Sequence, residues 1–148
     1  MTYLIIGGTG TVGKDVVAGL LRHTDSIVRV LTRSEKHAEK LPEGATAVIG
    51  DLEGPSTYDD IFDGVDRLFL LNPVSPTELH QGLAAVNEAR RVGVEHVVYL
   101  SVQDPETIAN APHFASKIGV ERAVKESGVP YTILRPNNFY QNDYWYED

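Results

Sequence analysis

A glycine-rich stretch near the N-terminus, GGTGTVG from Gly7 to Gly13, is the first part of the sequence that could do chemistry. It holds four of the 13 glycines, and it fits G-x-G-x-x-G counted from Gly8 as well as G-x-x-G-x-x-G counted from Gly7. Glycine permits a tight turn, a close approach of the backbone to a pyrophosphate, and close packing of a helix on a strand. The stretch therefore predicts a dinucleotide diphosphate site, with a plain strand-to-helix turn as the alternative.

An arginine and two hydroxyl residues occupy the positions at which the adenosine ribose of a bound dinucleotide would be recognised. The sequence VLTRSEK places Thr32, Arg33 and Ser34 there, with Lys36 nearby, about 20 residues after the glycines. An NAD-preferring site has Asp or Glu at this place, whereas a guanidinium and hydroxyls suit a 2′-phosphate. We therefore expect NADP(H) to be favoured over NAD(H). The alternative is that Arg33 is a solvated surface arginine.

Two other segments follow predicted strands and complete the expected cofactor site. Asp51, in IGDLEG, is placed to accept a hydrogen bond from an adenine amino group while Leu52 lies against the ring. A turn-forming role is the alternative for Asp51. In LLNPVS, the residues Leu71, Asn72 and Pro73 are expected to wall the pyrophosphate and nicotinamide-ribose region.

The elements that must position these residues alternate between apolar, β-branched strands and amphipathic helices. We predict strands over 2–7, 26–33, 45–51, 65–73, 95–102 and 130–136. We predict helices over 11–24, 34–41, 56–64, 75–93 and 112–128, with Ser34 as an N-cap and Pro76 in a first turn. This order predicts an α/β fold: a doubly wound, Rossmann-type parallel sheet in the order 3-2-1-4-5-6, covered on both faces, in one domain spanning residues 1–148. Ligands of such folds lie beyond the carboxyl ends of the strands.

The composition excludes several classes of function. A net charge of −8 argues against nucleic acid as a main partner, because neutralising phosphates requires a basic surface. The absence of cysteine removes disulfides, thiolate metal sites and cysteine nucleophiles, and we predict no metal site. The sequence has no apolar run long enough for a membrane span and no signal peptide, so we expect a cytoplasmic protein without a membrane partner.

The segments taken in order resemble the NmrA-like branch of the atypical short-chain dehydrogenases/reductases. The most specific part of the resemblance runs from GVEHVVYLS to TILRPNNFYQN. The resemblance implies that NADP(H) or NAD(H) binds at the glycine loop. By position it implies that Gly7, Gly10 and Gly13 shape the loop, that Thr9, Thr11 and Val12 line the diphosphate, that Arg33 lies at the adenosine ribose, and that Asp51 and Leu52 lie at the adenine.

The resemblance also indicates candidate catalytic residues. Ser101 falls where typical short-chain dehydrogenases keep a catalytic serine. Those enzymes use Tyr-x-x-x-Lys, in which the lysine binds the nicotinamide ribose, but here the sequence has His113 and Lys117 at that spacing. Lys117 can still anchor the ribose, and His113 can donate a proton near neutral pH. The alternatives are a surface histidine at a helix N-terminus and a solvated helix lysine. Asn137 and Phe139 are expected near the nicotinamide and the substrate.

Two functional classes stay open from the sequence. The first is an NADPH-dependent oxidoreductase of quinone-like or other small acceptors, and the second is a dinucleotide-binding sensor or cofactor-binding fragment without turnover. Members of the family are about twice as long as these 148 residues, so we expect most of the family's C-terminal substrate-binding region to be missing. The aromatic residues Tyr140, Tyr144, Trp145 and Tyr146 are expected to form a partner surface, such as a homo-oligomer contact.

Overall fold

One parallel sheet in the order β3-β2-β1-β4-β5-β6 forms the centre of the computed structural model, which describes residues 1–140. The strands are β1 (Thr2–Ile6), β2 (Ile27–Thr32), β3 (Ala45–Ile49), β4 (Arg67–Leu70), β5 (His96–Leu100) and β6 (Tyr131–Leu134). Each neighbouring pair is parallel, with β1 between β2 and β4. The predicted fold class and strand order are thus confirmed. The order reverses between β1 and β4, which is where such folds bind their ligands.

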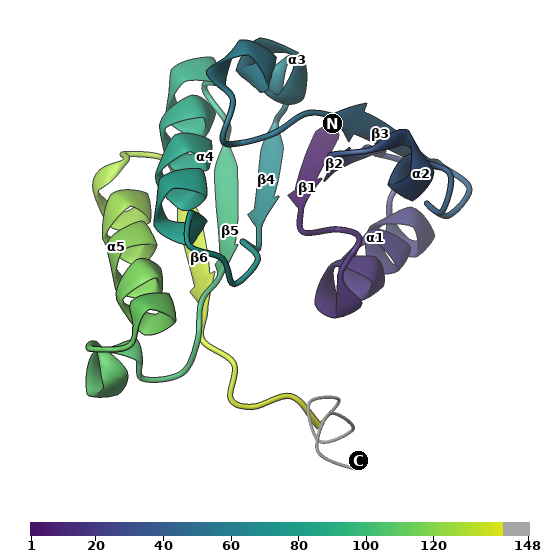
Figure 1. Cartoon of the computed structure of the whole chain (residues 1–148). Coiled ribbons are helices and arrows are strands. Elements are labelled where there is room, and N and C mark those ends of the chain that lie inside the picture. Colours follow the sequence, from purple (N-terminus) through teal and green to yellow (C-terminus); the bar gives the residue numbers. More distant parts are fainter. Residues whose placement is uncertain (141–148) are drawn as a thin grey trace.

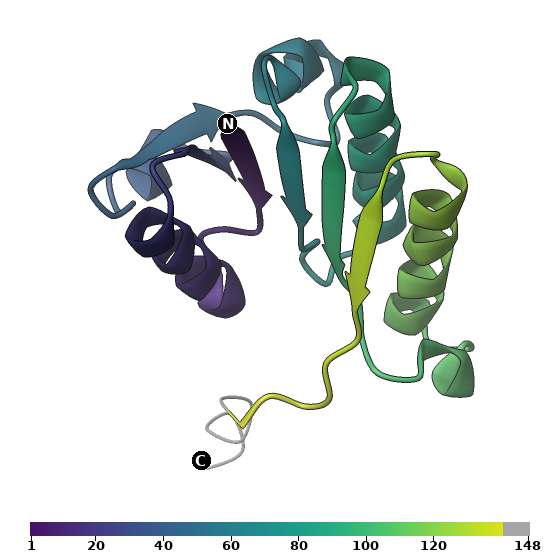
Figure 2. The same cartoon turned by 180° about the vertical axis from the view of Figure 1, so that it is seen from behind.

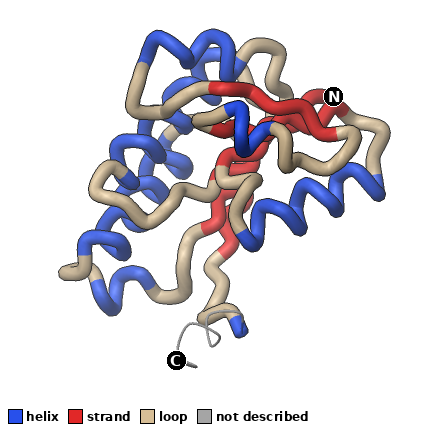
Figure 3. The backbone as a smooth tube through the Cα atoms, turned by 45° about the vertical axis from the view of Figure 1, so that its right-hand side comes forward, coloured by secondary structure: helices blue, strands red, loops and turns tan. Residues whose placement is uncertain are grey.

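The helices form two groups on opposite faces of this sheet. They are α1 (Thr11–His23), α2 (Glu35–Ala38), α3 (Tyr58–Phe62), α4 (Glu78–Val92) and α5 (Pro112–Glu126), with short 3-10 turns η1 (Pro55–Thr57) and η2 (Pro105–Ile108). The group of α3, α4 and α5 covers one face, and α1 and α2 lie on the other (Figures 1 and 3). Right-handed crossovers from one parallel strand to the next produce this division. No helix in residues 1–140 is long and apolar enough to cross a lipid bilayer.

The core is divided between the two faces of the sheet, as the alternation of side chains along a strand requires. In β1, Leu4 and Ile6 belong to the larger cluster beneath α3, α4 and α5, whereas Ile5 belongs to the smaller cluster beneath α1. Val17 of α1 is buried in the smaller cluster, and four further apolar residues of this helix pack against the cluster: Val12, Val16, Leu20 and Leu21. The amphipathic pattern of α1 is therefore confirmed.

The expectation that the sheet is covered on both faces is wrong for its last strand. In β6, Tyr131 is 42% exposed and Leu134 is 44% exposed. Figure 2 shows β4, β5 and β6 in front of α4 and α5, while α1 and α2 lie to the side over β1, β2 and β3. Within residues 1–140, the helices of this face reach only half of the sheet. Tyr140 is 87% exposed, and the other aromatic residues expected in a partner surface (Tyr144, Trp145 and Tyr146) lie outside the described residues.

One predicted helix start differs from the structure, and one is confirmed without the expected capping bond. The helix predicted over 75–93 begins at Glu78 with Thr77 as its N-cap, so Pro76 precedes the helix rather than lying in its first turn. Ser34 occupies the N-cap position of α2, but its side chain makes no capping hydrogen bond. The start of α4 is thus three residues later than predicted, because residues 75–77 form a turn in which the N–H of Glu78 donates to the carbonyl of Ser75. The predicted end at Gly93 is confirmed, since this glycine has a left-handed φ of +78°.

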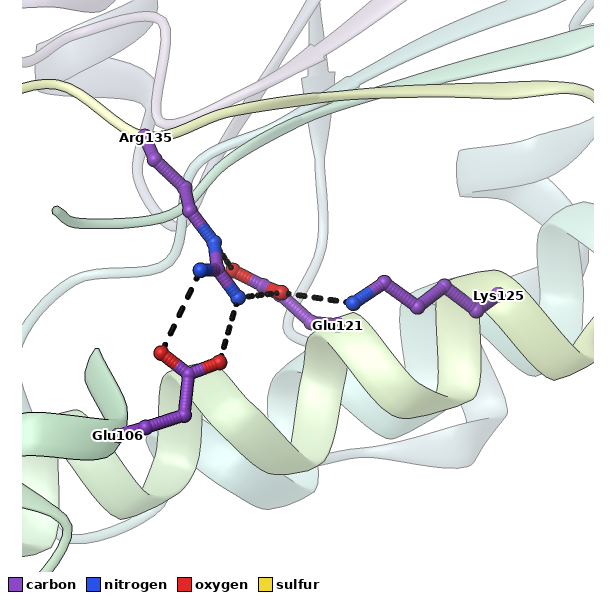
Figure 4. Close-up of polar contacts among 4 residues, drawn as sticks. All are labelled: Glu106, Glu121, Lys125 and Arg135. Carbon is purple, nitrogen blue, oxygen red and sulfur yellow. Dashed lines mark hydrogen bonds and ion pairs between the residues drawn. The ribbon is translucent and has the colours of Figure 1, made fainter. Parts of the chain in front are cut away.

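An ion network around the buried carboxylate of Glu121 links the chain, where it leaves β6, to the neighbouring helices (Figure 4). Arg135 donates hydrogen bonds to both carboxylate oxygens of Glu121, over 2.8 and 2.6 Å, and one of 2.7 Å to Glu106. Lys125 lies 3.1 Å from the same Glu121 carboxylate. Burial alone would raise the pKa of Glu121, but the hydrogen bonds from Arg135 and Lys125 outweigh it and lower this pKa to about 2. The network joins the end of β6 to α5 and η2.

Candidate functional site

The glycine loop between β1 and α1 contains glycines that the fold itself requires. Gly7 has a φ of +82°, and a Cβ added there would lie 2.4 Å from the carbonyl oxygen of Leu71. At Gly13, an added Cβ would lie 2.0 Å from the carbonyl oxygen of Gly7. Gly13 therefore lets α1 pack directly on the loop, and Gly7 makes the turn that brings β1 beside the end of β4. These two positions explain much of the motif without a ligand.

Gly10 differs, because nothing in the described protein requires glycine there. Its φ is −81°, which any residue adopts. The nearest atom to an added Cβ is the carbonyl oxygen of Gly7 at 3.4 Å, an ordinary contact. Gly10 lines a groove, however, so a side chain would take space from a ligand in it. This fits a loop whose backbone is approached closely by a diphosphate.

The start of α1 supplies unpaired donors at the same place. The first N–H groups of a helix have no partner within the helix and carry partial positive charge. No side chain caps this terminus, and its first turn has no acidic residue. The helix start beside Gly10 can therefore accept an anionic group.

A groove of about 580 Å³ runs along the carboxyl ends of β1, β2, β3 and β4. Its lining includes eleven of the predicted cofactor residues: Gly7, Thr9, Gly10, Thr11, Thr32, Arg33, Asp51, Leu52, Leu71, Asn72 and Pro73. Three other predicted residues, Val12, Gly13 and Lys36, do not line it. The backbone of Val12 and Gly13 still forms the first turn of α1, while their side-chain positions pack into the protein.

Arg33 and His37 line one end of this groove. Arg33 is exposed and makes no hydrogen bond or ion pair within the described part of the chain. The ring of His37 lines the groove where the sequence had suggested Lys36. α2 begins at Glu35, and residues 36 and 37 point to different sides of a helix. Thr32 is 5% exposed, and its hydroxyl donates a weak 3.4 Å bond to the carbonyl of Ser34.

Asp51 takes the role of a turn-forming residue. Its Oδ1 atom accepts a 2.9 Å hydrogen bond from the N–H of Glu53, as the sequence alternative anticipated. Leu52 is 3% exposed and belongs to the core beneath α3, so it forms the floor of the groove. Nearby, Gln81 donates a 3.0 Å bond to Glu53 and also lines the groove. Gln81 was not predicted, because a glutamine in a helix has no signature in sequence.

A second groove of about 620 Å³ continues from the first along β5 and β6. The two grooves share Leu71, Asn72 and Val74, so they meet at the end of β4. The second groove brings together the remaining predicted site residues: Ser101, His113, Lys117, Asn137 and Phe139. One continuous surface at the carboxyl edge of the sheet thus contains both halves of the predicted site.

Asn72 lies at the junction with an unsatisfied amide. The residue is 2% exposed, and neither its Oδ1 nor its Nδ2 atom has a hydrogen-bond partner among residues 1–140. Buried polar atoms without a partner are rare and costly in native proteins. An amide of this kind beside both grooves fits a site that receives a polar ligand.

Lys117 is buried, so the alternative of a solvated helix lysine is wrong. Its side chain is 2% exposed, and its Nζ atom lies 3.2 Å from Oε1 of Glu78. Nζ also donates a 3.2 Å hydrogen bond to the carbonyl of Leu100 and lies 5.2 Å from the centre of the Tyr99 ring. Burial lowers the pKa of Lys117, and the negative charge of Glu78 opposes this shift. The ammonium is therefore held in one place at the end of β5.

His113 is also more than a surface residue at a helix start. Its side chain is 26% exposed, and its Nδ1 atom lies 2.7 Å from Oε2 of Glu78, whose side chain is 1% exposed. Glu78 was missed from the sequence, where it reads as an ordinary acid in a first helical turn. Ser101 is 3% exposed, and its hydroxyl has no hydrogen-bond partner among residues 1–140.

Comparison with known proteins relates the chain to dinucleotide-dependent reductases. The model of the NmrA-like family matches residues 1–144. An NAD(P)H azoreductase of Xenophilus azovorans is 32% identical over 94% of this chain and 49% of its own length. The photosystem II assembly factor Ycf39 of Trieres chinensis is 34% identical over 95% of this chain and 47% of its own length. The chain thus spans about half the length of these relatives.

A solved structure agrees with the fold over nearly the whole chain. The NADPH-dependent quinone oxidoreductase QOR2 of Escherichia coli, in complex with NADPH, is similar with a TM-score of 0.85 and 25% identity. The match covers 97% of this chain and 51% of the oxidoreductase.

Proposed function

Because this chain belongs to the NmrA-like family, we propose that it binds NADP(H) in the two joined grooves, as the cofactor-binding part of an NADPH-dependent oxidoreductase of quinone-like or other small acceptors. The observation that carries the proposal is the continuous groove from Arg33 to Lys117, with Gly10 and the start of α1 between them. A dinucleotide needs an anion site flanked by two nucleoside sites, and the grooves offer them in that order.

The residues have distinct roles in this proposal. The α1 terminus and the backbone at Gly10 bind the diphosphate. Arg33 pairs with the 2′-phosphate of the adenosine ribose, which is why we favour NADP(H) over NAD(H). Leu52 lies against the adenine. Lys117, already held by Glu78 and the Leu100 carbonyl, presents its ammonium to the nicotinamide ribose.

The nicotinamide itself supplies the hydride, so the protein has to orient it and exclude water. The second groove lies beyond Asn72, where Asn137 and Phe139 form one wall. We place the acceptor there. Two of the relatives reported above carry reductase names, an NAD(P)H azoreductase and an NADPH-dependent quinone oxidoreductase, and this supports a small acceptor.

A module that binds the cofactor without turnover is the second candidate. His113 stands where the typical enzymes of the wider superfamily have their tyrosine. One relative is named as an assembly factor rather than a reductase. The chain also covers about half of its relatives, and we propose that residues 1–148 form a single cofactor domain that lacks most of the substrate-binding region.

One experiment separates the two candidates. NADPH binding to the chain is titrated by fluorescence, and NADPH oxidation is followed by absorbance with a panel of quinones and azo dyes. Saturable binding together with acceptor-dependent oxidation supports the oxidoreductase. Saturable binding without oxidation of NADPH by any acceptor supports the binding module, and no binding contradicts both.

A further inference from the structure

We propose that Glu78 is a positioning residue of this site: its buried carboxylate holds the imidazole of His113 with a proton on Nδ1, so that Nε2 is the atom that passes a proton to the acceptor. The part of this inference that concerns the acceptor rests on the proposed function. The part that concerns the imidazole rests on the contacts of Glu78 alone.

The carboxylate of Glu78 is shared between two side chains of α5. Oε2 lies 2.7 Å from Nδ1 of His113, and Oε1 lies 3.2 Å from Nζ of Lys117. The carboxylate is thus paired with the ammonium of Lys117. An ionised carboxylate only accepts hydrogen bonds. Nδ1 of His113 must therefore be the donor and carry the proton.

The elements around Glu78 favour this geometry. Glu78 is the first residue of α4, where the helix dipole favours a negative charge. His113 and Lys117 are four residues apart, on one side of α5. Glu78 from α4 contacts the imidazole, Lys117 from α5 shares the Glu78 carboxylate with it, and Asp104 lines the same groove. Tyr99 of β5 stays neutral, because burial and the charges of Glu78 and Glu121 raise its pKa.

His113 connects Glu78 to the groove. The side chain of Glu78 is 1% exposed, and Glu78 does not line either groove. His113 lines the second groove and is 26% exposed. The two ring nitrogens of an imidazole point in divergent directions, so Nε2 lies on the side of the ring away from Glu78. Glu78 acts through His113 and Lys117, which makes it a positioning residue.

The proton balance of quinone reduction fits this arrangement. Transfer of a hydride from NADPH to a quinone adds two electrons and one proton, and leaves one oxygen anionic. The imidazolium of His113 gives its Nε2 proton to that oxygen and becomes the neutral tautomer with a proton on Nδ1. Nε2 then takes up a proton from the bulk solvent, and the imidazolium is restored. In sum, quinone, NADPH and one proton become hydroquinone and NADP⁺.

The test reads the tautomer by NMR, without cofactor or turnover. Long-range ¹H–¹⁵N spectra of the ¹⁵N-labelled chain are recorded at a pH where the histidines are neutral, and His113 is assigned by the signals lost in His113→Gln. We expect the Nδ1–H form in the wild-type chain and loss of this preference in Glu78→Met. The control Glu121→Gln removes another buried carboxylate and should leave the tautomer unchanged. If Glu78→Met does not fold, Glu78→Met with Lys117→Met replaces it, since this pair removes both buried charges.

An Nε2–H form in the wild-type chain overturns the inference, and so does a tautomer that Glu78 substitution does not change. With 1,4-benzoquinone as acceptor, we expect His113→Gln and Glu78→Met each to lower kcat by about 100-fold, and the double variant to lose no more than either one. If the losses of kcat in the two single variants add up in the double variant, the inference that His113 passes a proton to the acceptor is overturned. A wild-type chain that reduces no quinone contradicts the proposed function, and the tautomer then still decides how Glu78 holds His113.

Discussion

The carboxylate of Glu78 lies 3.2 Å from the ammonium of Lys117, and the two side chains are 1% and 2% exposed. Removing one member of a buried ion pair leaves the other charge without compensation, at a cost of about 3–5 kcal/mol. Lys117→Met should therefore lower the free energy of unfolding by an amount of this order, measured by urea denaturation. Combining it with Glu78→Met should recover much of the loss, since both buried charges are then gone. A double variant less stable than Lys117→Met would contradict this coupling.

The two glycines at the ends of G-x-x-G in the loop should separate ligand binding from folding. Gly10→Val should abolish the binding of NADPH and NADH while the thermal unfolding temperature stays near that of the wild type, because no protein atom crowds this position. Gly13→Ala should instead lower stability by about 3 kcal/mol or more, since its Cβ would meet the Gly7 carbonyl at 2.0 Å. Thermal denaturation and cofactor titration on both variants make the comparison. A Gly10→Val chain that binds NADPH normally would remove the diphosphate assignment.

Arg33 should determine the preference for the phosphorylated cofactor. A hydrogen-bonded pair between a guanidinium and a phosphate contributes about 1.5–3 kcal/mol. We therefore expect Arg33→Ala to weaken NADPH binding roughly 10- to 100-fold and NADH binding little. Lys36→Ala is a matched control, since Lys36 is an exposed cation of the same segment that does not line the groove. Equal losses of NADPH and NADH affinity in Arg33→Ala would contradict the 2′-phosphate assignment.

The network around Glu121 should make stability depend on pH in the acid range. The pKa of Glu121 is lowered to about 2, whereas an unfolded glutamate titrates near 4.3. A lowered pKa stabilises the folded state above the unfolded value, and this stabilisation is lost as the pH falls from about 4.3 towards 2. Glu121→Gln should thus reduce stability at neutral pH by on the order of 2 kcal/mol and flatten its pH dependence in that interval.

Glu106 provides the control for this prediction, because it binds the same guanidinium from an exposed position. The Glu106 side chain is 60% exposed, against 3% for Glu121. Exposed ion pairs contribute below about 1 kcal/mol, so Glu106→Gln should change stability little. Urea denaturation between pH 3 and pH 7 measures both variants. Similar losses in the two would show that burial of Glu121 has no special effect.

The sheet and its order could be predicted because the signals that determine them are local. Each strand is a short, mostly apolar run, in most cases with β-branched residues, and helix ends such as Gly93 carry their own signature. The exposed face of β6 could not be predicted, since apolar residues such as Leu134 look the same whether or not a helix covers them. The η2 turn also went unpredicted, because its Pro105 is typical of any loop.

The candidate site also has a part that could be predicted from the sequence and a part that could not. The glycine loop and Arg33 follow a spacing that the sequence displays, and the groove does contain them. Glu78 reaches Lys117 from another helix, so no spacing connects the two residues. His37 lines the groove instead of Lys36 because one step along a helix turns a side chain by about 100°. Contacts between elements that are distant in sequence could therefore not be predicted from the sequence alone.

Cofactor binding in the groove is the central claim, and calorimetric titration of the chain with NADPH tests it most directly. The account predicts saturable binding at one site per chain, with weaker binding of NADH, and no binding by Gly10→Val although that variant remains folded. Absence of saturable NADPH binding to a folded wild-type chain, or equal binding by folded Gly10→Val, would contradict it.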